Sequence, residues 1–456
     1  MRAERTTTTR AAIVAAVGLV LADSSIVVLA LPEIYRELDV SVSTVVWVLI
    51  SFNLVLGAAA VPAARAAVIV GPARLAIAGL VVFGGASLAC GLASGIELLI
   101  AARCVQAIGG AAAVCASLEL LPAAIGSERR AVAAWAGAGA AGAALGPGIG
   151  GLLTEFISWQ SIFLVQVPLA PLLALPLVGL ASSERTRRAP APPAGRPHLA
   201  ANVALGLISA ALAAALFLVV LLLIEGWRLS PAVAAVAVTV MPVAALGTAP
   251  AARRVAAPVE ARAAAGMILV GGGLAGLGLL PRASVVLTFP PQLLVGIGLA
   301  LTLSALTEAA LAGRAPQATH GGWTIASRHA GVVVGLLVLT PLFTADLETQ
   351  REDAQRAGTA ALLDSPLDPV AKIELAGRIG DRIEADRDRV PVLGPAFEPL
   401  PADPGEREVV AGLRDEIEGE VDRAATAAFT RSFLLAAAFA LAALLPVAIA
   451  RRRVEL

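Results

Sequence analysis

The chain has 456 residues, of which 58% are hydrophobic and 15% are charged, and its mean hydropathy is +0.84. Its 34 basic and 34 acidic residues give a formal net charge of zero. This composition excludes a soluble globular protein and predicts a membrane protein.

Apolar stretches long enough to cross a bilayer as helices, which takes about 20 residues, recur along the chain. The first six cover residues 11–32, 43–63, 74–94, 97–120, 131–153 and 160–181, and the second six cover residues 200–224, 230–250, 263–281, 285–311, 322–345 and 427–450. They are rich in Ala and Leu and lack the alternation of a membrane strand. The sequence therefore predicts an all-α membrane protein with twelve transmembrane helices.

Basic residues cluster in the loops on one side of the predicted bundle. They precede the first span, flank the turn between spans 2 and 3, and follow spans 4, 6, 8 and 12. Because Lys and Arg concentrate in cytoplasmic loops, we expect this side, with both termini, to face the cytoplasm. Abundant Arg and Ala with a single Lys suggest a GC-rich bacterial genome, so we expect a bacterial cytoplasmic (inner) membrane. We do not expect a cleaved signal peptide, because the first apolar run continues into the bundle.

The spans divide into two sets of six. Residues 183–199, rich in Pro and Arg, are typical of a flexible cytoplasmic linker. We therefore expect an N-terminal six-helix bundle in residues 1–182 and a C-terminal six-helix bundle in residues 200–345 and 427–456. Between spans 11 and 12, residues 346–426 are expected to form an acidic, extracytoplasmic helical extension.

This extension carries most of the acidic residues of the chain. Residues 346–425 hold 20 of the 34 acidic residues and 10 of the 34 basic ones, so their net charge is −10. Two amphipathic patterns predict helices, with Val370, Ile373, Ile379 and Ile383 on one face, and Val409, Leu413, Ile417, Val421 and Ala425 on another. We expect spans 11 and 12 to continue as helices into the extension. It is either a surface for a lipid or a periplasmic partner, or a solvated cap without such a role.

Asp23 and Arg103 are ionisable residues inside predicted spans 1 and 4. Counting about 1.5 Å per residue, both lie roughly 9 to 14 Å below the outer surface. Such a group costs about 2.5 to 3.5 kcal/mol on insertion scales, and is a functional candidate by default. We predict that the two pair in the bundle interior, and that Asp23 takes up and releases a proton as its exposure changes. The alternative is a permanent structural ion pair.

Three further ionisable residues lie toward the inner side. Glu308 ends span 10, and Arg328 with His329 lies about 10 Å into span 11. We predict an inner charge pair of Glu308 with Arg328, and we consider His329 for proton coupling because imidazole changes charge in the physiological range. Alternatively, Glu308 reaches the headgroup region and His329 only makes a hydrogen bond.

Span 5 contains the sequence GAGAAGAALGPGIGG. Small residues four apart allow helices to approach closely, and proline loosens a helix. We expect the packing of this helix to be able to change at Gly142, Gly146, Pro147, Gly150 and Gly151.

Several segments resemble motifs of the major facilitator superfamily, and within it the drug/proton antiporters related to the fourteen-span branch. LADSSIVVLALPEI is similar to the span-1 motif LDxTIVNVALP at Asp23 and Pro32. RCVQAIGG resembles the span-4 motif at Arg103, Gln106 and Gly109, and GAALGPGIGG resembles the antiporter motif of span 5.

Two later segments extend the resemblance. SWQSIFLVQVP is similar to WRWIFLINVP, with Gln160 and Gln166 in place of Arg and Asn, and ASRHAGVVVG resembles SRQLGGALG with Arg328 in place. The loop between spans 2 and 3 departs from the family motif GxLaDrxGR, because Val68 and Ile69 occupy its charged positions. The central span pair of the fourteen-span branch is also missing.

The resemblance implies two six-helix bundles around a central cavity with alternating access. It also implies that Asp23 binds the proton, that Arg103 is its relay partner, and that the glycines of span 5 form a gating hinge. We consider Asn53, Gln106 and Trp135 as candidates for the lining of the cavity.

The leading functional hypothesis is a proton-coupled exporter of a hydrophobic or amphipathic compound, drug-like or lipid. Few aromatic residues favour an aliphatic cavity. The alternatives are a lipid or glycolipid transporter that uses the outer extension, and a non-transporting scaffold or sensor. The sequence shows no catalytic constellation and no P-loop, so nothing in it indicates an enzyme. We expect no cofactor, no metal and no nucleic acid. The expected partners are a proton, the substrate and the bilayer, with a periplasmic partner at 346–425 as a further candidate, and the chain is expected to be a monomer.

Overall fold

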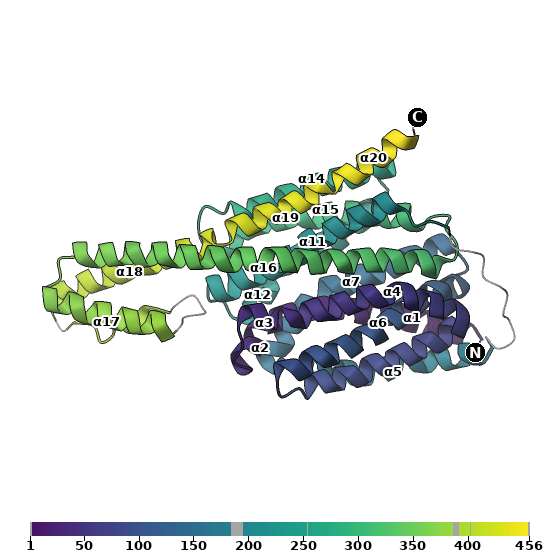
Figure 1. Cartoon of the computed structure of the whole chain (residues 1–456), viewed down its shortest axis with the longest axis horizontal. Helices are drawn as coiled ribbons and strands as arrows, with labels where there is room; N and C mark the ends of the chain where they lie inside the picture. Colours follow the sequence, from purple (N-terminus) through teal and green to yellow (C-terminus); the bar gives the residue numbers. More distant parts are fainter. Residues whose placement is uncertain (1, 184–194, 253, 386–391, 402, 455–456) are drawn as a thin grey trace.

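The computed structural model describes residues 2–183, 195–252, 254–385, 392–401 and 403–454, and every regular element within them is a helix. In this part of the chain, 12 helices are long and apolar enough to cross a membrane. Most helices run along the long axis of the molecule (Figure 1). The predicted all-α membrane protein with twelve spans is therefore confirmed.

The first six spans are formed by short and long helical segments in sequence. They are α1 (Arg2–Ile26) with η1 (Val28–Ala30) and α2 (Leu31–Glu37); α3 (Val42–Val45) with α4 (Trp47–Val70); α5 (Pro72–Gly91); α6 (Ile96–Ile125); α7 (Glu128–Phe156); and α8 (Ser161–Leu164) with α9 (Gln166–Ala174), η2 (Leu175–Leu177) and α10 (Val178–Ser183).

The second six spans follow the predicted linker, of which residues 184–194 lie outside the described residues. They are α11 (Leu199–Leu221) with the π-helix η4 (Leu222–Gly226); α12 (Pro231–Val238) with α13 (Val240–Ala252); α14 (Val259–Gly278); α15 (Val285–Leu311); the membrane part of α16 (Gln317–Asp364); and α19 (Thr430–Ala442) with α20 (Leu444–Val454).

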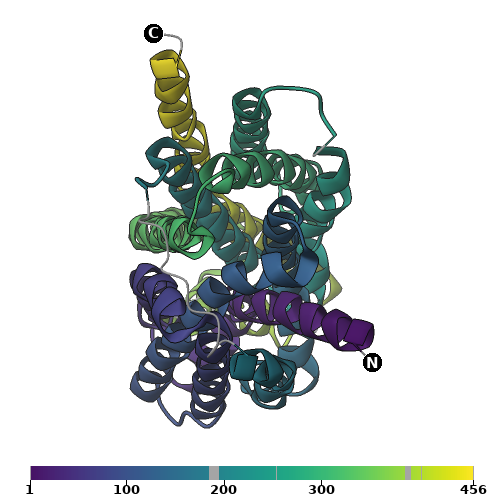
Figure 2. The ribbon, with the colours of Figure 1, turned by 90° about the vertical axis from the view of Figure 1, so that its right-hand side faces the viewer.

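The two sets of spans form two halves of the molecule. Figure 2 shows most helices of the first half, purple to blue, on one side and those of the second half, teal to yellow, on the other. The halves meet where α4 packs against α16 and where α7 packs against α12 and α13. Large buried side chains from both halves, including Phe52, Trp135 and Phe217, fill the interior.

Prolines account for the division of some spans into short helices. Pro32 lies at the start of α2 and cannot donate the backbone hydrogen bond that would continue α1. In span 6, Pro171 lies inside α9 and Pro176 at the start of η2. The interruption in span 1 follows Asp23 by a few residues, so Asp23 lies in the last turn of α1.

The outer extension consists of the second half of α16 together with α17 (Pro369–Ala385), the 3-10 turn η5 (Gly394–Phe397) and α18 (Pro404–Ala427). The helix α16 is 48 residues long and continues from the membrane into the extension. A separate small core, which includes Leu362, Leu375, Phe397, Leu413 and Ile417, holds the extension together.

The predicted faces of the extension helices need one correction each. In α17, Val370 and Ile373 are 64% and 73% exposed, while Leu375 is buried. At 100° per residue, residues 370 and 373 point away from the side that carries Leu375, Ile379 and Ile383, so the predicted face was wrong. In α18, Val410 is buried where the prediction had Val409, which is half-buried.

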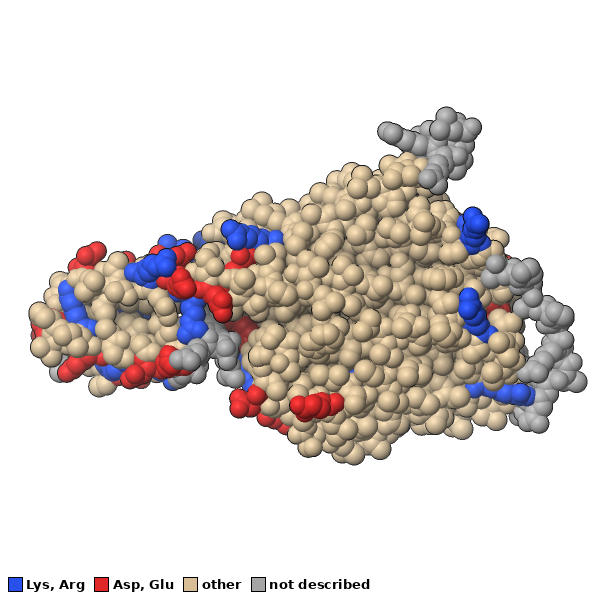
Figure 3. Space-filling view, viewed as in Figure 1, with Lys and Arg blue, Asp and Glu red and all other residues tan. Residues whose placement is uncertain are grey.

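Charged residues gather at the two ends of the molecule. On the face that Figure 3 shows, acidic and basic side chains lie over the extension and beside it, an almost uncharged belt lies over the spans, and basic side chains lie at the opposite end. The described parts of both chain ends lie at that opposite end (Figure 1). The uncharged belt is the surface that a bilayer would cover.

Candidate functional site

Asp23 of α1 and Arg103 of α6 form an ion pair in the interior of the N-terminal half. The side chains of both residues are 0% exposed. Nη1 of Arg103 donates to Oδ2 of Asp23, and the same nitrogen donates to Oε1 of Gln106 at 2.6 Å. The structure therefore brings together the two charges that the sequence placed at similar depths.

Two glutamines extend this pair into a network. Nε2 of Gln166, on α9, donates to Oδ1 of Asp23 at 2.7 Å, and Nε2 of Gln106 donates to the same oxygen at 3.2 Å. Gln106 also donates to Oγ of Ser87 at 2.8 Å. The Asp23 carboxylate thus accepts from spans 4 and 6, and these bonds offset part of the loss of hydration.

The guanidinium of Arg103 is held by spans 2 and 6 as well. Its Nε donates to the carbonyl of Val48 at 3.3 Å, and its central carbon lies 4.0 Å from the ring centre of Phe52 and 5.6 Å from that of Phe163. Its Nη2 is buried without a hydrogen-bond partner among the described residues. The cation is fixed in position, and one of its donors is left for another acceptor.

A stripe of glycines on α7 sets the position of α1, and hence of Asp23. Cβ atoms built at Gly142, Gly146 and Gly150 would each lie within 3.0 Å of a backbone atom of α1. The backbone atom nearest to Gly146 is the carbonyl oxygen of Ala22, which directly precedes Asp23. Only glycine permits this approach, so the stripe fixes the depth of the carboxylate.

The other two members of the predicted hinge lie differently. A Cβ at Gly151 would lie 2.6 Å from the Cβ of Ala235 on α12, so Gly151 faces the opposite half of the molecule. Pro147 lies inside α7, which continues as one helix of 29 residues. The role of this cluster as a hinge stays a prediction.

The predicted inner charge pair is replaced by a different one. Oε2 of Glu308 accepts from Nη2 of Arg262, on α14, at 3.0 Å, so the contact of Glu308 with Arg328 was predicted wrongly. Arg328 is half-buried, and its Nε has no partner among the described residues. The pair was predicted from the depths of Glu308 and Arg328 along their spans. The helices α14 and α15 pack side by side, and this packing places Arg262 beside Glu308.

The three candidates for a cavity lining are buried and hydrogen-bonded. Gln106 belongs to the Asp23 network, and Nε1 of Trp135 donates to the carbonyl of Val114 at 3.3 Å. Asn53 forms a 2.7 Å hydrogen bond with His329, which joins α4 to α16. The structure thus places His329 in a contact between the two halves, away from Glu308's ion pair.

An inner crevice of about 700 Å³ lies between α7 and the C-terminal half. Charged side chains of both signs line it, among them Glu128, Arg129, Arg262 and Glu308. The inner contact between the halves also includes Glu119, whose Oε1 accepts from the backbone N–H of Ala318 at 2.8 Å. Glu119 therefore provides an acceptor for one of the free backbone N–H groups in the first turn of α16.

Sequence reasoning missed Ser87 and the role of Gln166 in the network. Ser87 is one of several serines in apolar helices, and nothing in its spacing sets it apart. Gln166 was noticed only as a replacement in a motif, although an amide inside a span is itself a signal because a buried amide needs partners.

The network holds the negatively charged carboxylate of Asp23 in the interior of the bundle. Its hydrogen-bond donors lie on other helices, so they would separate from the carboxylate if the helices moved. Among the described residues, no group of three or more His, Cys, Asp or Glu could hold a metal ion. The charged groups that the network holds are the carboxylate of Asp23 and the guanidinium of Arg103.

Comparisons with known proteins point to one family. The model of the Major Facilitator Superfamily matches residues 13–340. The multidrug resistance protein Stp of Mycobacterium tuberculosis is 36% identical over 176 residues, which are 37% of this chain and 33% of that protein. The methylenomycin A resistance protein of Bacillus subtilis is 37% identical over 162 residues, 34% of this chain and 35% of that protein. Each alignment thus spans about a third of the relative's length.

A solved structure agrees over nearly the whole chain. A bacterial homologue of the human lysosomal transporter Spinster, in an inward-facing and unoccupied conformation, superposes with a TM-score of 0.58. The comparison covers 97% of this chain and 98% of that one, at 16% sequence identity, and so it concerns the fold.

Proposed function

Since the chain belongs to the major facilitator superfamily, we propose that it is a proton-coupled exporter of hydrophobic or amphipathic compounds that works by alternating access. The observation that carries this proposal is the buried ion pair of Asp23 with Arg103. Two opposite charges with no exposure inside a membrane protein are expensive to bury, and replacing such a pair by apolar residues is often stabilising. A functional role explains why the pair is kept.

Coupling follows from what happens to Asp23 when its surroundings change. In the conformation of the structure, the carboxylate accepts from Arg103, Gln106 and Gln166. A rearrangement that withdraws these donors leaves a desolvated anion, which favours uptake of a proton. Return of the donors favours its release. Proton uptake on one side and release on the other would drive the exchange of conformations.

The proposed substrate class comes from relatives and composition. Two relatives are named for multidrug and methylenomycin A resistance, which supports export of small compounds. The chain holds one Tyr, five Trp and eleven Phe, and is rich in Ala and Leu. Aliphatic walls suit a flexible apolar molecule better than a flat aromatic cation, which binds aromatic faces. We place the protein in the bacterial cytoplasmic membrane with both termini inside, as the basic residues at that end favour.

Lipid or glycolipid export is the second candidate, and the extension favours it. The helix α16 and the α18–α19 segment continue from the membrane to a folded layer outside it (Figure 1). A substrate that must leave a bilayer needs an apolar surface beyond the headgroups. Deleting residues 350–420 should abolish lipid transfer from vesicles while the remaining spans stay folded, and normal transfer by the deleted chain would refute this candidate.

The coupling proposal is tested in vesicles with the pH clamped on both sides. Efflux of an apolar dye is measured with and without a pH gradient for the unchanged protein, for Asp23→Asn, and for the control Glu97→Gln, an exposed acid at the outer end of α6. We expect gradient-driven efflux to disappear in Asp23→Asn and to persist in the control. Unchanged gradient-driven efflux in Asp23→Asn would falsify the coupling role.

A non-transporting scaffold or sensor, the third hypothesis, has a different signature. It predicts no efflux by any variant under any gradient, whereas a transporter with another coupling residue still moves the dye.

A further inference from the structure

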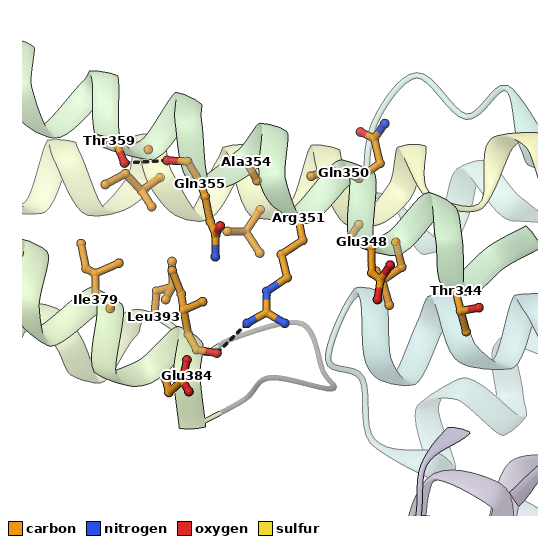
Figure 4. A pocket seen from close by; sticks show the side chains of 18 of the residues that line it. Thr344, Glu348, Gln350, Arg351, Ala354, Gln355, Thr359, Ile379, Glu384 and Leu393 are labelled. Atoms are coloured by element: carbon orange, nitrogen blue, oxygen red, sulfur yellow. Dashed lines mark hydrogen bonds between the residues drawn. The ribbon is translucent and has the colours of Figure 1, made fainter. Parts of the chain in front are cut away.

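The outer extension forms most of an open cavity of about 690 Å³. Its walls are the second half of α16, α17 and α18. Figure 4 shows Arg351 and Gln355 of α16 pointing toward α17. Aliphatic side chains line much of it, including Leu347, Leu362, Ile379, Ile383, Ile417 and Val421.

Small residues keep the cavity open. Ala354 and Gly358 on α16, and Ala376 and Gly380 on α17, occupy lining positions where larger side chains would fill the space. A Cβ at Gly380 would meet nothing within 4 Å. Glycine in a helix interior is unfavourable by about 1 kcal/mol relative to alanine. No steric contact requires glycine there, so a larger side chain placed at this position has room to enter the cavity.

The cavity begins at the outer end of the membrane part. Phe343 and Thr344, near the outer end of span 11, line it, as do Ser41 and Ser43 at the start of span 2. From there it continues along α16 to Leu362. A hydrocarbon chain leaving the outer side of the bundle would meet this apolar wall directly.

Acidic side chains outnumber basic ones in the lining of the cavity. Glu348, Glu384 and Arg351 line the cavity, which gives it two acids and one base. The Nη2 of Arg351 donates to the carbonyl of Ile383 at 2.7 Å, so this guanidinium braces α17 against α16 (Figure 4). The surrounding residues 346–425 have a net charge of −10. An anionic headgroup would be repelled here, and a neutral or cationic one would not.

We propose that this cavity binds the aliphatic tail of a neutral or cationic amphiphile. Its volume lies within the range of about 300 to 1,000 Å³ that is usual for ligand sites, and it combines apolar walls with a few polar groups as such sites do. The inference deepens the proposed function and rests on it in one respect, that the ligand is an exported compound received on the outer side.

The test is equilibrium binding to the full chain in lipid nanodiscs, with empty nanodiscs subtracted. Three radiolabelled probes share a dodecyl tail: dodecylamine, dodecanol and dodecanoate. We expect saturable binding of the amine and the alcohol, and binding of dodecanoate at least about tenfold weaker. If dodecanoate binds most tightly of the three probes, the proposed preference for a neutral or cationic headgroup is wrong. If no probe binds saturably, the proposal is overturned, and a protein partner becomes the alternative ligand of the extension.

Two glycines on one helix provide a matched pair of variants. Both glycines are exposed, and neither has an atom within 4 Å of a built Cβ, but only Gly380 lines the cavity, whereas Gly377 does not. We expect Gly380→Trp to weaken binding of dodecylamine at least about tenfold and Gly377→Trp to leave it within about twofold. Equal binding by both variants and the unchanged protein would overturn the site. Ala354→Trp fills the same cavity from α16 and guards against a folding defect confined to α17.

The outcome separates this inference from the proposed function. Asp23→Asn is expected to bind dodecylamine as the unchanged protein does while losing gradient-driven efflux. If efflux is absent in every variant but the Gly380→Trp effect holds, the cavity is a binding site and the export proposal fails. If efflux is driven by the gradient but Gly380→Trp binds normally, the export proposal stands and the cavity assignment fails.

Discussion

His329 on α16 and Asn53 on α4 share a hydrogen bond of 2.7 Å, and both side chains are buried where the two halves of the molecule meet. The amide nitrogen of Asn53 donates to the carbonyl of Leu49 at 2.8 Å, so the amide oxygen faces His329. An amide oxygen only accepts, and we therefore assign the proton to Nδ1 of His329. The bond exists only while α4 and α16 are in contact at this depth.

The first prediction concerns this bond. Asn53→Leu is expected to destabilise the protein by about 1 to 3 kcal/mol, because the buried N–H of His329 loses its acceptor. Thermal unfolding in detergent measures the change. The control is Asn202→Leu, since the Oδ1 of Asn202 is buried without a partner among the described residues and its removal leaves nothing unpaired. An equal loss of stability in both variants would show that the hydrogen bond between Asn53 and His329 does not contribute to stability as predicted.

The second prediction separates the structural from the functional role of the buried ion pair. Arg103→Leu is expected to lower stability by about 3 to 5 kcal/mol, because Asp23 remains as an uncompensated buried charge. Combining it with Asp23→Leu should restore most of the stability, since two apolar side chains replace the pair. Gradient-driven efflux should be absent in both variants. Efflux that survives in the double variant would show that the pair is only structural.

The third prediction concerns the glycines of α7. Gly146→Ala is expected to lower stability by about 1 to 3 kcal/mol, because the added methyl group meets the backbone of α1 and must push the helices apart. Gly148→Ala on the same helix should be neutral or slightly stabilising, as the nearest atom to its Cβ is Oγ1 of Thr239 at 3.6 Å. The measurement is the unfolding temperature of each variant. Equal unfolding temperatures for Gly146→Ala and Gly148→Ala would contradict the prediction.

The fourth prediction compares the two glutamines of span 6. Gln166→Leu should cost about 1.5 to 3 kcal/mol, because a buried carboxylate loses a hydrogen-bond donor. We expect a parallel loss of gradient-driven efflux. Gln160→Leu removes a partly exposed bond to Glu37 at 2.9 Å, and should change both stability and efflux much less. If Gln160→Leu proves the more damaging, the network around Asp23 is not the centre of the mechanism.

Much of the fold could be predicted because the membrane imposes a strong length and hydropathy requirement on each span. The pair of Asp23 and Arg103 was within reach for a related reason. Two costly charges at similar depths, in a bundle with few others, are each other's best partners.

The rest depended on how the helices are arranged around the bundle, which depth does not reveal. Glu308 and Arg328 have compatible depths, yet Arg262 on the adjacent helix is the actual partner of Glu308. The contact of His329 with Asn53 joins residues 276 positions apart, and no local pattern announces it. The outer cavity was also out of reach, because small residues such as Gly380 look the same in sequence whether they face a hollow, a neighbour or solvent.

The continuity of α16 has a mechanical consequence. At about 1.5 Å per residue, its 48 residues form a helix about 70 Å long. Glu119 holds its inner end, His329 touches α4 part of the way along, and its outer segment forms one wall of the 690 Å³ cavity. If α16 tilts about the His329 contact, its outer end moves farther than any part of the helix inside the bilayer, because the outer end lies farthest from that contact. Ser41 and Ser43 of the N-terminal half also line the cavity, so a tilt of α16 relative to that half would change the distance between the cavity walls.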